Sequence, residues 1–396
     1  MNRPEGTGST EKDESVREPA KRKRKLNKAM RAGLIALCAI VFLACTALAA
    51  FALWASPPDV SGSDIKEQNN PEPAVSPTPE TATPEPTATP EPEITPEPEP
   101  TPITKTRREN TYTLLVVGRD RVGMNTDTIM AARLDCEAGT LDVVSIPRDT
   151  LVNVPWAVKK VNSIYGTLGT EGLVEGIEDL LGFDVDNYVI VNTFVFRDVI
   201  DYIGGVYFDV PVYMNYDDPL QDLHIHLQPG YQLLDGNKAE QVVRFRQNND
   251  GSGYPTGDLG RIETQHAFFS QLARQILSLG NIASLPQIID LVLQNTDTDL
   301  TSGNMAFYAQ ELMKLNSENV RFYTMPQENV YIRGGSYVSI QLQPWLEMIN
   351  DCLNPFNLDI TEENLNVITY GENGIYATGG EAPGMGSFFD YYALYE

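Results

Sequence analysis

Hydrophobic and polar residues follow two distinct periods after residue 110, and each period predicts one kind of element. Short apolar runs predict buried strands at 111–118, 127–135 and 141–147. The segment "CEAGT" between the second and third runs has the length and the glycine of a hairpin loop. We therefore expect these two runs to pair as antiparallel strands. Further strands are expected at 187–192, 206–211 and 320–326.

Helical spacing of apolar residues predicts the remaining elements. In "EGLVEGIEDLLG" (171–182) the apolar residues share one helix face, and Gly182 closes the helix. The alternation of strands and helices predicts an α/β fold, with a mixed sheet flanked by helices in one domain over 109–354. No element is predicted in the polar C-terminal tail, 355–396. Further helices are expected at 196–205, 258–277, 285–294, 304–315 and 343–353.

One apolar segment stands apart from these periods. Residues 32–55 are uncharged, and at about 1.5 Å per residue they are long enough to cross a bilayer core of roughly 30 Å. The basic stretch "KRKRKLNKAMR" precedes them, which predicts a transmembrane helix with a cytoplasmic tail at 1–31 and everything later outside. Cleavage as a signal peptide near Ala47 and a lipobox around Cys45 are alternatives, but the apolar run is too long for an ordinary signal peptide.

The stretch from 56 to 108 changes composition again. It contains "TPEPTATPEPEITPEPEPTPIT", in which proline recurs every second or third residue between glutamate and threonine. Such a composition cannot build a core and favours extended chain. We interpret it as a disordered linker that spaces the folded domain from the membrane.

Charge and cysteine content narrow the function classes. The formal net charge of −25 argues against binding nucleic acid in bulk, although part of it comes from the linker glutamates. The four cysteines lack the close pairing of a metal site. Cys136 and Cys352 would lie outside the cell and could form a disulfide, which the sequence leaves open.

Candidate chemistry lies in four groups of charged residues at the ends of predicted strands and helices. Each group taken alone is also compatible with a structural ion pair or a solvated face. The groups are Arg119, Asp120, Arg121 and Asp127 in "GRDRVGMNTDT"; Arg148 and Asp149 after a strand; Arg244 and Arg246 in "VVRFRQ"; and Asp258, Arg261 and Gln265 in "GDLGRIETQ".

Arginines so arranged indicate an anion site. If "VVRFRQ" is extended, Arg244 and Arg246 share one face and Phe245 the other. Two arginines on one face repel each other unless they hold an anion. The interleaved carboxylates favour phosphoryl chemistry, in which cations neutralise the non-bridging oxygens and Mg²⁺ or Mn²⁺ is held by carboxylates such as Asp120 and Asp127.

The three histidines do not indicate a catalytic site. His224 and His226 form "HIH" in an alternating segment, which predicts a surface strand; a metal pair is the alternative, with no third ligand evident. His266 beside Gln265 is interpreted as packing. The chain has no G-x-S-x-G motif, so a serine hydrolase has little support.

The order of these motifs resembles the LytR-CpsA-Psr family of bacterial wall-polymer ligases. The resemblance rests on "LLVVGRDR", "NTDTIM", "VVSIPRDT", "KVNSIYG", "VIVNTFVFRDVIDYIGGV", "LDGNKAEQVVRFR" and "GDLGRIETQ" in that order. It is close from Tyr112 to Leu279 and weaker as far as Asn354. A basic N-terminus, one span and an outer domain agree with it.

The resemblance implies an outer-surface phosphotransferase of a Gram-positive-type envelope. Its substrate would be a polyprenyl-pyrophosphate-linked glycan, with the lipid in an apolar cleft and the acceptor a muramyl C6 hydroxyl of peptidoglycan. The implied catalytic residues are Asp127, Arg148, Asp258 and Arg261; the implied pyrophosphate-binding residues are Arg119, Arg121, Arg148, Arg244, Arg246, Arg261 and Gln265; the implied metal ligands are Asp120 and Asp127.

The base is left open between Asp127 and Asp258, and Asp149 is expected to orient an arginine. Two positions depart from the family pattern, because Asn125 and Thr264 stand where the family often has basic residues. Hydrolysis of the same lipid-linked substrate, or binding of polyprenyl phosphate without turnover, are the alternative functions.

Overall fold

The computed structural model describes residues 54–60, 106–119, 126–219, 223–276, 284–372 and 374–394. Within these ranges no helix is both long and apolar enough to cross a membrane. Residues 32–53 of the predicted span and most of the predicted linker lie outside them. Asp120, Arg121 and Asn125 also lie outside them.

A six-stranded mixed sheet forms the centre of the fold, in the order β10-β3-β2-β1-β4-β9. Strand β1 pairs antiparallel with β2 and parallel with β4, and β10 runs parallel to β3. The predicted hairpin of β2 and β3 is confirmed. The strands are β1 Thr111–Arg119, β2 Thr126–Asp135, β3 Thr140–Ser145, β4 Asn187–Asn192, β9 Asp297–Thr298 and β10 Val320–Thr324.

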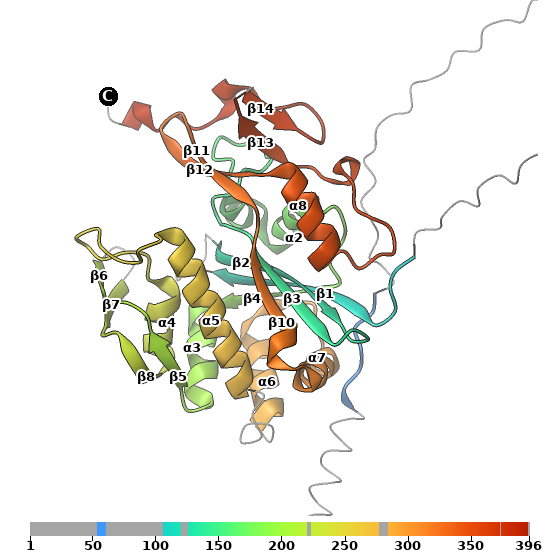
Figure 1. Ribbon diagram of the computed structural model, residues 1–396, viewed down its shortest axis with the longest axis vertical. Coiled ribbons are helices and arrows are strands. Elements are labelled where there is room, and N and C mark those ends of the chain that lie inside the picture. The colour runs from blue at the N-terminus through green and yellow to red at the C-terminus, as the bar shows by residue number, and fades with distance from the viewer. Residues whose placement is uncertain are drawn as a thin grey trace, which may run out of the picture. The chain divides into compact units, whose positions relative to one another are not determined.

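Helices cover both faces of this sheet (Figure 1). Alternate residues of β1 face opposite layers, with Leu115 and Val117 against one core and Val116 against another. One face packs on α2 (Asn162–Leu181), α8 (Leu342–Met348) and a π-helix (Ile349–Leu353). The other face packs on α5 (Asp258–Ile276) and α7 (Ser302–Lys314). The prediction of an α/β domain with a mixed, flanked sheet is therefore confirmed.

Helix α2 begins earlier than predicted. It starts at Asn162 and is broken at Gly169, where φ is +73°. Its end at Gly182 is as predicted, because that glycine adopts a left-handed φ of +78° and donates its N–H to Glu178.

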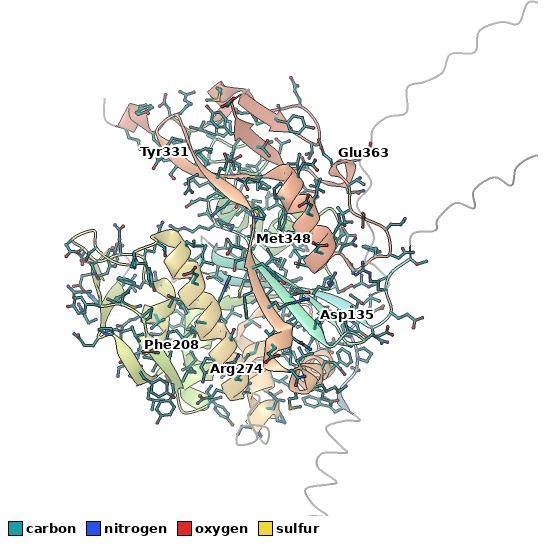
Figure 2. The ribbon with its side chains drawn as sticks, in the orientation of Figure 1. Asp135, Phe208, Arg274, Tyr331, Met348 and Glu363 are labelled. Atoms are coloured by element: carbon teal, nitrogen blue, oxygen red, sulfur yellow. The ribbon has the colours of Figure 1, made fainter. Side chains whose placement is uncertain are left out.

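A second subdomain lies between β4 and β9. Two-stranded ribbons β5–β8 and β6–β7 and four helices enclose a core of their own. Phe208 of β5 packs edge-on against Phe268 of α5, with ring centres 5.4 Å apart (Figure 2 labels Phe208). Its other elements are α3 Thr193–Tyr202, β5 Val206–Val210, β6 Met214–Asp218, β7 Leu223–Leu227, β8 Gly230–Leu234, α4 Gly236–Arg244 and α6 Leu285–Asn295.

The C-terminal residues, for which the sequence predicted no element, fold against the domain. Ile360, Leu365 and Val367 are buried in the core that contains α2 and α8. Hairpin β13–β14 lies within this region, and hairpin β11–β12 precedes it in the chain. Their bounds are β11 Gln327–Ile332, β12 Gly335–Ile340, β13 Ile368–Gly371 and β14 Gly374–Ala377, with short 3-10 helices at Ser317–Asn319, Glu362–Asn364, Met385–Ser387 and Tyr392–Leu394.

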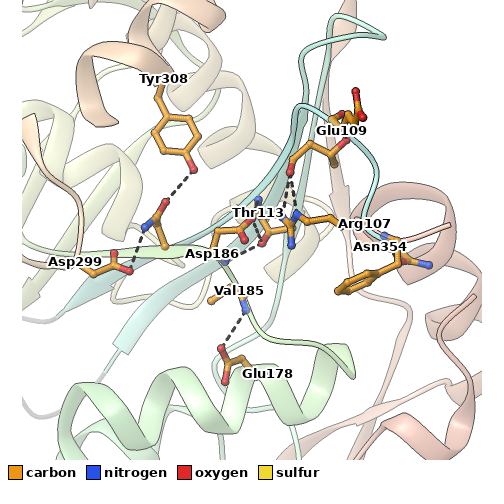
Figure 3. A network of polar contacts seen from close by, with 12 residues as sticks. Arg107, Glu109, Thr113, Glu178, Val185, Asp186, Asp299, Tyr308 and Asn354 are labelled. Atoms are coloured by element: carbon orange, nitrogen blue, oxygen red, sulfur yellow. Dashed lines mark hydrogen bonds and ion pairs between the residues drawn. The ribbon is translucent and has the colours of Figure 1, made fainter. Parts of the chain in front are cut away.

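A buried polar network fixes the entry of the chain into the sheet (Figure 3). The Asp186 carboxylate pairs with Arg107 and accepts hydrogen bonds from the Thr113 amide at 2.7 Å and hydroxyl at 2.9 Å. Nearby, Tyr308 donates to Asn187 at 3.1 Å, and Asn187 donates to Asp299 at 3.2 Å. Arg107 thus ties the residues before β1 to the start of β4.

The short segment 54–60 also packs on the domain. The Ser56 amide donates to the Gly303 carbonyl at 3.0 Å, and Asn304 donates its side-chain amide to the Ser56 carbonyl at 3.2 Å. Val60 packs against the cluster that contains Tyr308. This segment therefore lies at the first turn of α7.

The disulfide that the sequence left open is not formed. Cys136 and Cys352 are both free cysteines. Burial raises the pKa of the Cys136 thiol to about 11. Cys352 is buried within the π-helix Ile349–Leu353. The hypothesis that these two pair is wrong for this structure.

Candidate active site at an arginine-lined cavity

A cavity of about 410 Å³ opens at the edge of the sheet where β1 and β4 end. Because β1 and β4 are parallel, their carboxyl ends reach the same edge, and the first residues of β2 lie beside them. Such an edge is the usual ligand site in α/β sheets. Helices α3, α4 and α5 and the ribbon β6–β7 complete the wall.

Part of the wall is apolar. Side chains from the sheet, two helices and the ribbon contribute to it, so residues distant in sequence meet here. They include Val116, Met130, Val191, Phe196, Leu223 and Phe269. A wall of this kind suits a hydrocarbon chain.

Arginines dominate the charge of the cavity. Five arginines and one carboxylate are among its described lining residues. This excess of positive charge stands in a chain whose formal net charge is −25, so the cavity concentrates a potential opposite to that of the whole molecule. It is suited to an anion with several charged oxygens. The charged residues are Arg119, Asp127, Arg148, Arg244, Arg246 and Arg261.

Arg148 is held by two carboxylates. Its Nη1 lies 2.5 Å from Asp127 Oδ1, and its Nε lies 3.8 Å from Asp149 Oδ2. Asp149 also contacts the Lys160 ammonium at 3.0 Å and stands behind Arg148, outside the cavity lining. It therefore contacts an arginine as the sequence predicted, while Asp127 faces the cavity.

Arg244 and Arg246 reach the cavity by a route that the sequence did not predict. Arg244 is the last residue of α4 and pairs with Glu240 at 3.1 Å, one helical turn earlier. Phe245 follows in extended conformation and is fully buried against Tyr254. The extended conformation considered for this stretch applies to Phe245 but not to Arg244, and both arginines line the cavity because the backbone turns at the helix end.

The remaining arginines come from β1 and α5. Arg119, at the end of β1, donates to the Tyr165 hydroxyl and lies 5.3 Å from the centre of that ring. Arg261 and Gln265 are one turn apart on α5, and both line the cavity. Gln265 also donates to the Val243 carbonyl at 2.7 Å, which ties α5 to α4.

Three predicted residues remain to be placed. Asp258 is the first residue of α5, at the same helix end as Arg261. The side chain of Asp258 is outside the described part of the structure, as are Asp120 and Arg121. Thr264 is buried and donates to the Gly260 carbonyl at 2.8 Å.

Several polar residues of the cavity were not predicted from the sequence. Asn192 caps α3 by accepting from the Val195 amide at 2.9 Å, and Thr193 follows it. Their position directly after an apolar strand was the available signal. Tyr216 and Gln247 carried no such signal, because their place in the cavity depends on the tertiary fold.

The donor set is compatible with a hard divalent cation. Asp127 is the single carboxylate among the described lining residues. Mg²⁺ typically takes one or two carboxylates and completes its shell with substrate phosphates and water. Asp127 with a pyrophosphate would meet that requirement.

His266 packs against Phe322, as predicted. Its Nε2 lies 2.7 Å from Ser145 Oγ, and its ring centre lies 5.0 Å from that of Phe322. Burial lowers the pKa of His266 to about 4. The imidazole is therefore neutral at neutral pH.

Comparison with known proteins agrees with this architecture. The sequence profile of the LytR_cpsA_psr family matches residues 81–353. The cell wall biosynthesis protein LcpA of Corynebacterium glutamicum is 31% identical over 255 residues, which are 57% of this chain and 47% of that protein. The polyisoprenyl-teichoic acid–peptidoglycan teichoic acid transferase TagV of Bacillus subtilis is 30% identical over 179 residues, 44% of each chain. The matched region thus spans less than half the length of these relatives.

Solved structures share the fold. The crystal structure of Bacillus subtilis TagV superposes with a TM-score of 0.53 at 22% identity, covering 62% of this chain and 96% of that one. A crystal structure of a Streptococcus agalactiae protein also gives 0.53 at 22% identity, covering 64% and 88%. At this level of identity the likeness concerns the fold.

Proposed function

Because the chain belongs to the LytR_cpsA_psr family, we propose that it transfers a glycan phosphate from a polyprenyl-pyrophosphate carrier to peptidoglycan, forming a phosphodiester at a muramyl C6 hydroxyl. The names of its relatives support this: TagV and TagU of Bacillus subtilis are teichoic acid transferases that join a polyisoprenyl-linked polymer to peptidoglycan. The domain would act outside the cell, anchored by the apolar segment 32–55.

The arginine-lined cavity carries the proposal. Its apolar wall is suited to the lipid, and its five arginines to a pyrophosphate. Both features meet within one volume of about 410 Å³, as a lipid pyrophosphate requires. A surface that bound only a polar glycan would not need the hydrocarbon wall.

The reaction needs little covalent chemistry from the protein. The acceptor hydroxyl attacks the phosphorus that bears the glycan, a new P–O bond forms, and the bond to the bridging oxygen breaks so that polyprenyl phosphate leaves with it. Arginines such as Arg148 and Arg246 stabilise the charge on the non-bridging oxygens. The proton of the hydroxyl passes to a carboxylate, for which Asp127 and Asp258 are the candidates.

A cation would complete this arrangement. Mg²⁺ or Mn²⁺ held by Asp127, with Asp120 as the second candidate ligand, would neutralise phosphate charge. Arg119 offsets the family's missing basic residues, since it reaches the same cavity from β1. Asn125 and Thr264 therefore need not change the class of reaction.

The experiment uses the full chain in detergent micelles with a polyprenyl-pyrophosphate-linked sugar, Mg²⁺ and peptidoglycan fragments. Mass spectrometry looks for sugar phosphate joined to the fragment. Arg261→Ala and Arg246→Ala are expected to lower the product by about 100-fold or more, since each removes a cation from the transition state. Arg274→Ala is the matched control, because Arg274 is exposed near the far end of α5 (Figure 2).

The other outcomes distinguish the alternative functions. Free sugar phosphate and polyprenyl phosphate, with no joined product, would identify a hydrolase. Lipid binding without any product would identify a non-catalytic binding protein. If the Arg261 and Arg274 variants gave equal amounts of product, the cavity would not be the site of the reaction.

A further inference from the structure

The outer face of the β6–β7 ribbon brings together two imidazoles and a carboxylate. His224 and His226 are two residues apart on β7, so both point to the same face. The antiparallel register places Asp217 directly opposite His224 and Asn215 directly opposite His226. Asp217 is the third ligand that the sequence did not reveal, because it comes from the neighbouring strand.

The distances fit the coordination shell of a small cation. One ligand atom from each of Asp217, His224 and His226 lies within 4.8 Å of the other two. His226 Nε2 is 3.3 Å from Asp217 Oδ1, and His224 Nδ1 is 2.5 Å from the same oxygen. In a tetrahedral site with metal–ligand bonds of about 2.0–2.1 Å, ligand atoms are separated by about 3.3 Å. His224 Nδ1 lies closer to the carboxylate oxygen than this separation, so binding an ion requires that imidazole to move back by about 0.8 Å.

A hydrogen bond at Nδ1 of His226 leaves its Nε2 as the nitrogen available to bind a metal ion. Its Nδ1 lies 2.8 Å from the Asn215 side-chain oxygen, which can only accept a hydrogen bond. Nδ1 therefore carries the proton, and in the neutral ring Nε2 presents a lone pair towards Asp217. A metal ion between Nε2 and the carboxylate would take the place of the proton that otherwise joins them. Ordering of a ligating histidine through its other nitrogen is the usual second layer of a metal site.

Asp217 completes the donor set as a carboxylate. The side chains of both histidines are 55% exposed and that of Asp217 is 45% exposed, so an ion can enter directly from solvent.

We propose that Asp217, His224 and His226 bind a divalent transition-metal ion of the Zn²⁺ class, with the fourth position open to water. Two imidazoles and one carboxylate favour such an ion, whereas Mg²⁺ and Ca²⁺ prefer shells made of oxygen. This site is separate from the candidate cation position at Asp127, which belongs to the cavity.

The metal would brace one wall of the cavity. Tyr216 and Leu223, on the same two strands, line the cavity. The ribbon is also fastened to the segment after Arg246, since the Asp217 amide donates to Asn249 at 2.8 Å and the Asn215 amide donates to Asn248 at 2.6 Å. An ion that bridges β6 and β7 therefore restrains the wall and the segment next to Arg246 together.

The test uses the full chain without a polyhistidine tag, in detergent micelles, titrated with Zn²⁺ in competition with a chromophoric chelator. One Zn²⁺ per chain is expected to bind. Asp217→Ala and His226→Ala are each expected to weaken binding by at least about 100-fold, because they remove a ligand. Asp209→Ala is the matched control on the neighbouring ribbon, where the carboxylate is exposed and faces Tyr231. It is expected to bind as the wild type does.

A second measurement needs no variant. Co²⁺ added to the wild-type chain is expected to give the intense visible absorption of a four-coordinate ion, and an excess of Zn²⁺ should abolish it. Zn²⁺ binding that survives equally in all three variants would place the metal elsewhere and overturn the proposal. Absence of both stoichiometric Zn²⁺ binding and the Co²⁺ spectrum would overturn it as well.

Discussion

At the scale of single residues, the buried Asp186 is held by several partners inside the fold, whereas Arg148 in the cavity is held by two carboxylates and stays partly exposed. Asp186 is fully buried and receives Arg107 and both polar groups of Thr113. Arg148 at the cavity is partly exposed, and its Nε lies 3.8 Å from the nearest carboxylate oxygen of Asp149. A charge held in this way can exchange partners when an anion arrives, whereas Asp186 cannot.

Asp186→Ala should be strongly destabilising, by about 3–5 kcal/mol, because it leaves Arg107 without its buried partner. Urea unfolding followed by tryptophan fluorescence measures the change. Asp390→Ala is the matched control, since Asp390 pairs with Arg333 at the surface. Equal urea midpoints for the two variants would show that the buried Asp186 network stabilises the fold no more than the surface ion pair of Asp390 does.

His266 predicts a dependence of stability on pH. Its pKa in the folded protein is about 4, below the value of about 6.5 for an exposed histidine. Between these values the unfolded chain binds a proton that the folded chain does not, so stability is lost as the pH falls from about 6.5 towards 4. The full shift corresponds to roughly 3 kcal/mol. Because the ring is partly exposed, we expect about 1 kcal/mol.

Comparing unfolding of the wild type with that of His266→Gln at pH 7 and pH 5 isolates this contribution. Glutamine can still bond to Ser145 but does not titrate. The variant should lose less stability on acidification than the wild type. Parallel losses would mean that His266 is accessible to protons in the folded state.

At the scale of elements, the hydrophobic period and the loop or glycine residues at element ends predicted the helices and strands well where local sequence decides the structure. The β2–β3 hairpin and the end of α2 at Gly182 were readable because a loop and a glycine mark them. Helix α4 was not predicted, since "VVRFRQ" was considered only as extended chain. Its start is marked by the Asp235 carboxylate, which accepts a hydrogen bond from the Lys238 amide.

The charged residues of the candidate site could be predicted from the sequence, but the way in which they and the apolar wall come together could not. The arginines could be named from motifs at the ends of elements. The apolar wall could not, because Leu223 lining a cavity looks like any core leucine in sequence. Asp217 lies opposite His224 because of the register of β6 and β7, and this register could not be predicted from the sequence between the two strands.

Gly182 provides a prediction at this scale. Ala at position 182 must adopt φ of +78°, which costs about 1–2 kcal/mol, and its Cβ would lie 2.8 Å from Ile360 Cγ2. Gly139→Ala is the matched control, because its φ is +63° but nothing lies within 4 Å of the added carbon. Thermal unfolding should show a larger loss for Gly182→Ala. Equal losses would mean that the contact with Ile360 relaxes without cost.

At the scale of the whole molecule, the residues after 354 are part of one folded unit with the sheet. Leu365 is fully buried in the core that joins α2, α8 and the sheet. Leu365→Ala should therefore cost about 2–5 kcal/mol, as for a leucine in any core. Leu394→Ala, at a leucine that is 65% exposed, is the matched control in the same region. Chemical unfolding measures the free energy of unfolding of both variants. If Leu365→Ala were as stable as Leu394→Ala, the residues after 354 would contribute nothing to the stability of the domain.

The docking of Ser56 on α7 has a mechanical consequence. Residues 54–60 and residue 107 are both fastened to the same domain, the first to Gly303 and Asn304 and the second to Asp186. Tension applied to the chain at Trp54 is therefore borne first by the hydrogen bonds of Ser56, before any load reaches the proline-rich sequence that follows. The length of that sequence does not set the reach of the domain from residue 54 as long as these bonds hold.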